Sequence, residues 1–261
     1  MNSHATSHRG TGPEPHPFAG ARPTIDGTAR RTLLRTALTG AAALGAGLGV
    51  AGPAAAAPTA PGTEPPRPGT PDEALRELAA GNRRWRTYRE RHPHENPAIR
   101  HTLATSQHPF AVVLGCIDSR VPPELVFDQG LGDLMTVRTA GEVLDEAVLG
   151  SVAYGVLELG IPLVLVLGHQ SCGAVRAAVA AEQSGEHLPA HMQYLVDQIR
   201  PAIDHGQEGD ARIDATVSAN VRLVRSRLAA EPELAARIAT GKLAIVGARY
   251  ELTTQAVNRL A

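Results

Sequence analysis

Short runs of apolar residues recur along the chain, and each run is followed by a polar cluster or a turn. The runs carry no charged residue, which is typical of strands that are covered on both faces. Segments with helical periodicity alternate with them, and this alternation predicts an α/β fold with a mainly parallel sheet of about four strands and flanking helices. The predicted strands are Phe110–Leu114, Leu134–Val137, Ile161–Leu167 and Leu243–Val246.

The clearest helix start lies at Thr70. Thr70 can cap the helix, Pro71 suits the first helical position, and Glu73 completes a capping box. We expect this helix to run towards Trp85 and the folded domain to begin near Thr70. The other predicted helices are Leu144–Leu159, Ala174–Ala181, His191–Ile203 and Ala215–Ala230.

The first 69 residues do not share this pattern. The paired Arg30 and Arg31 precede the uncharged, Ala- and Gly-rich run 36–63, which resembles a twin-arginine export signal cleaved after Ala56. A membrane anchor or an untargeted tail is the alternative, although so many Gly and Pro residues disfavour a stable span. The predicted organisation is a signal peptide (1–56), a Pro-rich linker (57–69) and a folded domain (70–261), in an exported protein that is secreted or held in the cell envelope.

Composition narrows the class of protein. The 261 residues include 25 Lys and Arg against 26 Asp and Glu, and this balance disfavours a nucleic-acid binder or a polybasic membrane-surface protein. A hydrophobic content of 43% is enough for a substantial core. Two cysteines exclude a disulfide-rich scaffold but leave a single bridge open.

The candidate chemistry follows the first and third predicted strands, in the clusters 115–120 and 168–173. Parallel strands end at the same edge of a sheet, so Cys116, His169 and Cys172 can converge there. Two thiolates and one imidazole form a three-ligand zinc set with one open position, which is the catalytic pattern. A disulfide between the two cysteines is the alternative that the residues themselves leave open.

The two clusters resemble the zinc motifs of the β-class carbonic anhydrases. Cys116–Pro122 and Gly168–Gly173 carry the resemblance, which extends over roughly residues 72–256. It implies a β-carbonic anhydrase-like fold and one Zn²⁺ per subunit, with Cys116, His169 and Cys172 as ligands. It also implies a lyase that hydrates CO₂ reversibly to bicarbonate and a proton, by attack of a zinc-bound hydroxide.

The resemblance implies roles for other residues as well. Asp118 would form a salt bridge with Arg120 in the active state, or swing onto the zinc in a closed state, so Asp118 is a candidate metal residue too. Gln107 would hydrogen-bond the substrate. Tyr154 matches an active-site tyrosine, and Gly173 is a candidate for substrate binding beside it.

The resemblance to the β-class carbonic anhydrases favours their plant-like, open-site subtype. Members of the other subtype bind inhibitory bicarbonate with a tryptophan at the position of Val113. Thr139 and Met135 depart from the usual asparagine and phenylalanine, which bears on rate and substrate fit rather than on the zinc site. The resemblance also implies a homodimer or higher homo-oligomer. The charge balance predicts no nucleic-acid partner, and the composition of the run 36–63 predicts no stable membrane span in the mature chain.

Two other functions stay open. The same site could serve a hydrolase for another small heterocumulene such as carbon disulfide. The chain could also be a non-catalytic zinc-binding module. The pair Asp118–Arg120 and Gln107 argue against the second alternative, because they would have no purpose in a purely structural site.

Overall fold

The computed structural model describes residues 67–261. The expected signal peptide and nearly all of the expected linker therefore lie outside the described residues. The strands are β1 (Ala111–Cys116), β2 (Leu134–Thr139), β3 (Leu163–His169), β4 (Ala244–Tyr250) and β5 (Val257–Leu260). The α-helices are α1 (Pro71–Arg86), α2 (Pro97–Thr102), α3 (Pro123–Val126), α4 (Glu146–Leu157), α5 (Gly173–Ser184), α6 (Met192–Ile199), α7 (Gly209–Ala230) and α8 (Pro232–Ala239). Two 3₁₀ turns, η1 (Ala140–Glu142) and η2 (Arg200–Ala202), complete the described elements.

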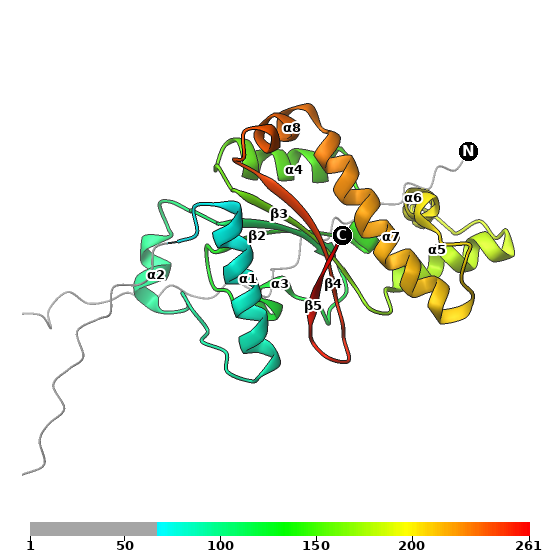
Figure 1. Cartoon of the computed structure of the whole chain (residues 1–261), viewed down its shortest axis with the longest axis horizontal. Helices are drawn as coiled ribbons and strands as arrows, with labels where there is room; N and C mark the ends of the chain where they lie inside the picture. The colour runs from blue at the N-terminus through cyan, green and yellow to red at the C-terminus, as the bar shows by residue number, and fades with distance from the viewer. Residues whose placement is uncertain (1–66) are drawn as a thin grey trace, which may run out of the picture. The chain divides into compact units, whose positions relative to one another are not determined.

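The strands form one sheet in the order β2-β1-β3-β4-β5 (Figure 1). The pairs β1–β2, β1–β3 and β3–β4 are parallel, and β5 pairs antiparallel with β4. The four predicted strands and the mainly parallel sheet are thus confirmed. The fifth strand was missed because it is a short edge strand with half-exposed ends and no continuous apolar run.

Alternating residues of the central strands pack into two hydrophobic cores, one on each face of the sheet. Val113 of β1 and Leu165 of β3 pack with α1 and with Phe127, which follows α3, on one face of the sheet. Val112 of β1 and Val166 of β3 pack with α4, α7 and α8 on the other face. This period of two is what a sheet covered on both sides requires, and it explains the continuous apolar runs.

A third cluster lies beyond the carboxyl ends of the strands. Cys116 and Cys172 pack there with apolar residues of α5, α6 and α7. The two cysteines are therefore buried under a helical cap rather than left on an open edge.

Helix α1 starts as predicted. Glu73 N donates to Thr70 Oγ1 (3.3 Å) and Thr70 N donates to Glu73 Oε2 (3.1 Å), so both halves of the capping box are present. Within the helix, a Cβ built on Gly81 would lie 1.7 Å from the carbonyl oxygen of Phe127. Gly81 is thus a site of close backbone approach between α1 and the segment after α3.

The other predicted helices correspond to α4, α5, α6 with η2, and α7, which begins earlier than expected. Helices α2, α3 and α8 were not predicted. Helix α2 has no buried residue and α3 is only four residues long, so neither leaves an apolar period in the sequence. No helix among residues 67–261 has the length and apolar character needed to cross a bilayer.

Candidate metal centre

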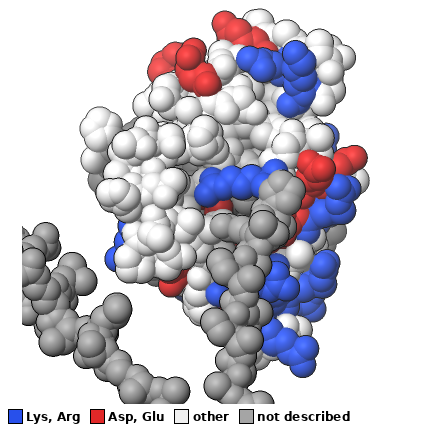
Figure 2. Space-filling model, turned by 90° about the vertical axis from the view of Figure 1, so that its left-hand side faces the viewer, with Lys and Arg blue, Asp and Glu red and all other residues white. Residues whose placement is uncertain are grey.

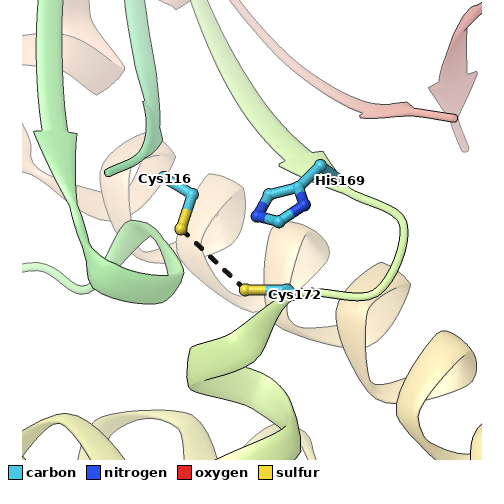
Figure 3. A group of neighbouring side chains, drawn as sticks. All are labelled: Cys116, His169 and Cys172. Carbon is cyan, nitrogen blue, oxygen red and sulfur yellow. Dashed lines mark hydrogen bonds between the residues drawn. The ribbon is translucent and has the colours of Figure 1, made fainter. Parts of the chain in front are cut away.

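The three predicted ligands come together at the carboxyl edge of the sheet. Cys116 is the last residue of β1, His169 is the last residue of the adjacent β3, and Cys172 caps the start of α5. Their donor atoms all lie within 4.8 Å of one another. In Figure 3 the imidazole ring of His169 and both sulfurs face a common point.

The geometry fits a zinc ion better than a disulfide. The two sulfurs are 3.9 Å apart and both cysteines are free, whereas a disulfide needs about 2.05 Å. Tetrahedral zinc with bonds of about 2.3 Å to sulfur separates two thiolates by about 3.8 Å. All three side chains are buried, and His169 Nε2 has no hydrogen-bond partner. A cation at this point would supply the partner that a buried ring nitrogen needs.

The charges of the two thiols lead to the same conclusion. A hydrogen bond from Cys172 lowers the pKa of the Cys116 thiol to about 4. That same hydrogen bond, together with burial, raises the pKa of the Cys172 thiol. Two buried thiolates this close repel each other, so ionisation of both is favoured only with a cation beside them.

The orientation of His169 is set by the residue that follows it. Its Nδ1 donates to the carbonyl oxygen of Gln170 (2.9 Å), which leaves Nε2 to face the sulfurs. Gln170 is itself held twice: its N–H donates to the Tyr250 carbonyl (2.8 Å), and its Oε1 accepts from the N–H (3.1 Å) and hydroxyl (3.3 Å) of Thr253. The tight turn continues through Ser171, which has a φ of 56°.

Cys116 is held from the other side. The N–H of Gly141 in η1 lies 3.5 Å from Cys116 Sγ and donates to it. The guanidinium of Arg138, on β2, donates to the carbonyl oxygens of Cys116 (2.8 Å) and Asp118 (2.7 Å). Arg138 therefore fixes the loop that leaves β1.

Asp118 lies beside the metal centre and is paired with Arg120. Arg120 Nε donates to Asp118 Oδ1 (2.9 Å) and Nη2 donates to Oδ2 (2.7 Å), a bidentate pair. These hydrogen bonds lower the pKa of the Asp118 carboxyl to about 2. Asp118 Oδ2 is 3.8 Å from His169 Nε2. The structure thus has Asp118 on Arg120, outside the group of three donors, rather than in the metal-bound arrangement of a closed state.

Comparison with known proteins decides the family. The carbonic anhydrase family model matches residues 111–257, which is more than half of the chain. Carbonic anhydrase 2 of Mycobacterium tuberculosis (strain ATCC 25618 / H37Rv) is 44% identical over 184 residues, covering 70% of this chain and 89% of the relative. A β-carbonic anhydrase of Coccomyxa, solved with acetazolamide, superposes with a TM-score of 0.57 at 26% identity, covering 72% of this chain and 82% of its own.

The chain belongs to the β-class carbonic anhydrase family. A further match is one of two tetrameric β-carbonic anhydrases of the ascomycete Sordaria macrospora, with a TM-score of 0.59 and 20% identity over 72% of this chain and 96% of its own. At that identity the likeness concerns the fold alone. Family membership makes zinc the expected metal, in agreement with the donor set on β1, β3 and α5.

Two candidate residues of this carbonic anhydrase are not at its own metal centre. Gln107 is exposed and precedes β1, so the length of that strand, roughly 16 Å, separates it from Cys116. Tyr154 is half exposed on α4, in a hollow along the outer strand β2 whose lining also includes Arg138. Gly173, by contrast, is the first residue of α5 and directly follows Cys172, one of the three candidate donors.

One buried acid near the centre escaped the sequence analysis. Glu142 is 1% exposed, has a φ of 54°, and its Oε1 has no hydrogen-bond partner. Its Oε2 accepts a long hydrogen bond from Asn220 Nδ2 (3.5 Å). Burial, and next the charge on Cys116, raise the pKa of the Glu142 carboxyl well above its usual value, which favours its neutral form. A lone acid between Gly141 and Val143 was the only sequence signal for it.

Proposed function

We propose that this protein catalyses the reversible hydration of CO₂ to bicarbonate and a proton, with one Zn²⁺ per subunit held by Cys116, His169 and Cys172. The observation that carries the proposal is the convergence of three buried donor atoms within 4.8 Å, with a paired carboxylate beside them. When bound, zinc would act as a Lewis acid and make a water molecule nucleophilic near neutral pH.

Asp118 is the residue that would orient the attacking water. Its carboxylate accepts hydrogen bonds only, and a pKa of about 2 keeps it ionised throughout the physiological range. Arg120 holds both carboxylate oxygens, so the direction of the remaining lone pairs is fixed. Asp118 would therefore accept a hydrogen bond from the attacking water and so direct the water's oxygen towards CO₂.

Product binding would use the start of α5. The first N–H groups of a helix lack partners within the helix and carry the positive end of its dipole. Gly173 is the first residue of α5 and is exposed. Its N–H group is suited to a bicarbonate oxygen that develops negative charge beside Cys172.

The position of Gln107 supports a second subunit in the active assembly. Because Gln107 lies at the far end of β1 from Cys116, it can hydrogen-bond substrate only at the metal centre of a neighbouring chain. We therefore expect a homodimer or a higher homo-oligomer in which Gln107, and Tyr154 along the outer strand, complete a partner's site. The Sordaria macrospora β-carbonic anhydrase, which has the same fold, is a tetramer.

We assign the protein to the plant-like, open-site subtype. Val113 is fully buried within β1 and stands where the bicarbonate-inhibited subtype has its tryptophan. The pairing of Asp118 with Arg120 supports an open fourth position. Gln107 and Tyr154 agree with this assignment through the sequence match alone.

Export is the remaining part of the proposal. Residues 1–56 would form a twin-arginine signal, 57–69 a linker and 70–261 the catalytic domain. Amino-terminal sequencing of the protein recovered from outside the cytoplasm tests this: a start at Ala57 is expected, and an uncleaved protein retained in the cytoplasm would contradict export.

Metal analysis combined with stopped-flow CO₂ hydration tests the function. The purified protein should contain one zinc per subunit and hydrate CO₂, and Cys172→Ser should lose both metal and activity. Sulfide release from carbon disulfide without CO₂ hydration would favour the other heterocumulene as substrate. Zinc binding without either activity would show that the protein is a non-catalytic zinc-binding module.

A further inference from the structure

A groove separate from the metal centre runs between α1 and the strands β4 and β5. Its volume is about 390 Å³, within the range of about 300–1,000 Å³ that small organic ligands occupy. None of the three metal-donating residues lines it. Its apolar lining residues are Leu75, Leu78, Ala79, Phe127, Leu165, Ala248 and Val257.

Two elements contribute arginines to this groove. Arg76, Arg83 and Arg86 come from α1, and their spacing of seven and three residues places them along one side of the helix. Arg259 comes from β5, where it pairs with Ala248 of β4. Directly paired residues of antiparallel strands share a face of the sheet, so Arg259 lies on the same face as Ala248, which packs in the core under α1.

The positive charge of these four arginines has no counterpart in the groove. All four are exposed, no Asp or Glu lines the groove, and none of the four forms an ion pair within residues 67–261. The neighbouring Arg84 differs, because it pairs with Glu77 and Asp128. In Figure 2 basic side chains gather at the lower right of the molecule.

The helix dipole accounts for only part of this arrangement. Basic residues in the last turn of a helix are favourable, which suffices for Arg83 and Arg86. Arg76, in the first half of α1, lies one turn after Glu73 and attracts its carboxylate, so Arg259, on a different element, is the arginine without such a local explanation. Guanidinium groups bind carboxylates and phosphates through paired hydrogen bonds, so this set is suited to an anionic head group.

We propose that the groove binds an amphipathic organic anion. An apolar body would lie against the accessible apolar side chains of the groove, which are Leu75, Ala79 and Val257. A carboxylate or phosphate head would be held by the arginines from both sides. The site needs no metal and shares no residue with the metal centre, so it stands independently of the proposed catalytic function.

Isothermal titration calorimetry of the zinc-loaded protein with decanoate and with decyl phosphate, below micelle-forming concentrations, tests this proposal. Saturable binding of either anion at one site per subunit is expected, and the better of the two identifies the head group. Decyltrimethylammonium has the same tail with a cationic head and should not bind. Failure of both anions to bind, or equal binding of the cationic compound, would overturn the proposal.

Variants locate the site. Arg83→Gln combined with Arg259→Gln should weaken anion binding by about tenfold or more, because two charged hydrogen-bond donors are lost. Arg176→Gln removes an exposed arginine of α5 outside the groove and should leave binding unchanged. Zinc content and circular dichroism establish that the variants are folded. Equal binding by the double variant, or a changed oligomeric state in place of lost binding, would assign the groove to another role and reject this one.

Discussion

The donor atoms of the metal centre are fixed by contacts to the backbone. Cys116 Sγ accepts from the Gly141 N–H and His169 Nδ1 donates to the Gln170 carbonyl. Cys172 is placed by the start of α5. Because these contacts orient the donors, neighbours that never touch the metal should influence its affinity, and the carboxylate of Asp118 can act on substrate without serving as a ligand.

Replacement of Asp118 separates orientation from ligation. Asp118→Ala should retain zinc, because the three donors remain, but lose CO₂ hydration by about a hundredfold or more, as expected when the group that orients the attacking water is removed. Metal analysis and stopped-flow assays at neutral pH measure the two effects. Full activity of this variant would remove Asp118 from the mechanism.

Glu142 should make stability depend on pH in a defined direction. Its pKa is raised in the folded protein, so its contribution is fully present below the unfolded value of about 4.3 and is lost as pH rises, because the unfolded chain ionises while the buried acid stays neutral. Glu142→Gln removes this dependence. The melting temperature of the zinc-loaded variant relative to wild type should therefore rise between pH 5 and pH 8.

Glu186→Gln, in an exposed loop, is the matched control and should show no such trend. An unchanged difference between Glu142→Gln and wild type across this pH range would mean that Glu142 is ionised in the folded state.

The elements of this fold act on the metal centre through loops that are distant in sequence. The hairpin between β4 and β5 carries Thr253, whose N–H and hydroxyl hold the side chain of Gln170 in the turn between β3 and α5. The carbonyl of Gln170 in turn orients His169. The terminal hairpin is therefore part of the support of the metal centre.

Loss of the Gln170 side chain should loosen that support. Gln170→Ala is expected to weaken zinc binding by up to about tenfold, the low end of the cost of removing an orienting group, because the backbone carbonyl that orients His169 remains. Competition with a chromophoric chelator measures the affinity. Gln183→Ala, on the exposed side of α5, should bind zinc like the wild type, and equal affinity of both variants would show that the hairpin does not support the site.

The packing of helix α1 against the segment after α3 can be tested by glycine substitutions. Gly81→Ala places a methyl group against the Phe127 carbonyl and should destabilise the fold by about 1–3 kcal/mol. Gly150→Ala, inside α4 with nothing within 4 Å, should stabilise it by up to about 1 kcal/mol. Urea unfolding of the two variants compares them. A stable Gly81→Ala protein would mean that α1 does not pack as described.

The sequence predicted those features that depend on local pattern. Cys116, His169 and Cys172 could be placed together because each follows an apolar strand, and α1 could be placed from its capping box. Strand β5 could not, since an edge strand leaves no apolar run. The roles of Gln170 and Arg138 depend on partners far along the chain or across the sheet, such as Thr253, and only the folded structure brings them together.

The whole molecule is expected to work as an assembly, because Gln107 lies a strand length away from its own metal centre. Mixing two inactive variants tests this. Gln107→Ala keeps a metal centre, and Cys172→Ser keeps Gln107, so co-expressed mixed oligomers should regain activity above the sum of the separate variants. No regain in verified mixed oligomers would place Gln107 outside the reaction.

The central claim is that a zinc ion is bound by two sulfurs and one imidazole from β1, β3 and α5. Zinc K-edge X-ray absorption of the purified protein tests it most directly. The account predicts two sulfur neighbours at about 2.3 Å and one imidazole nitrogen at about 2.0–2.1 Å, with a light atom in the fourth position. A zinc shell without sulfur, or a protein whose two cysteines are oxidised to a disulfide, would contradict it.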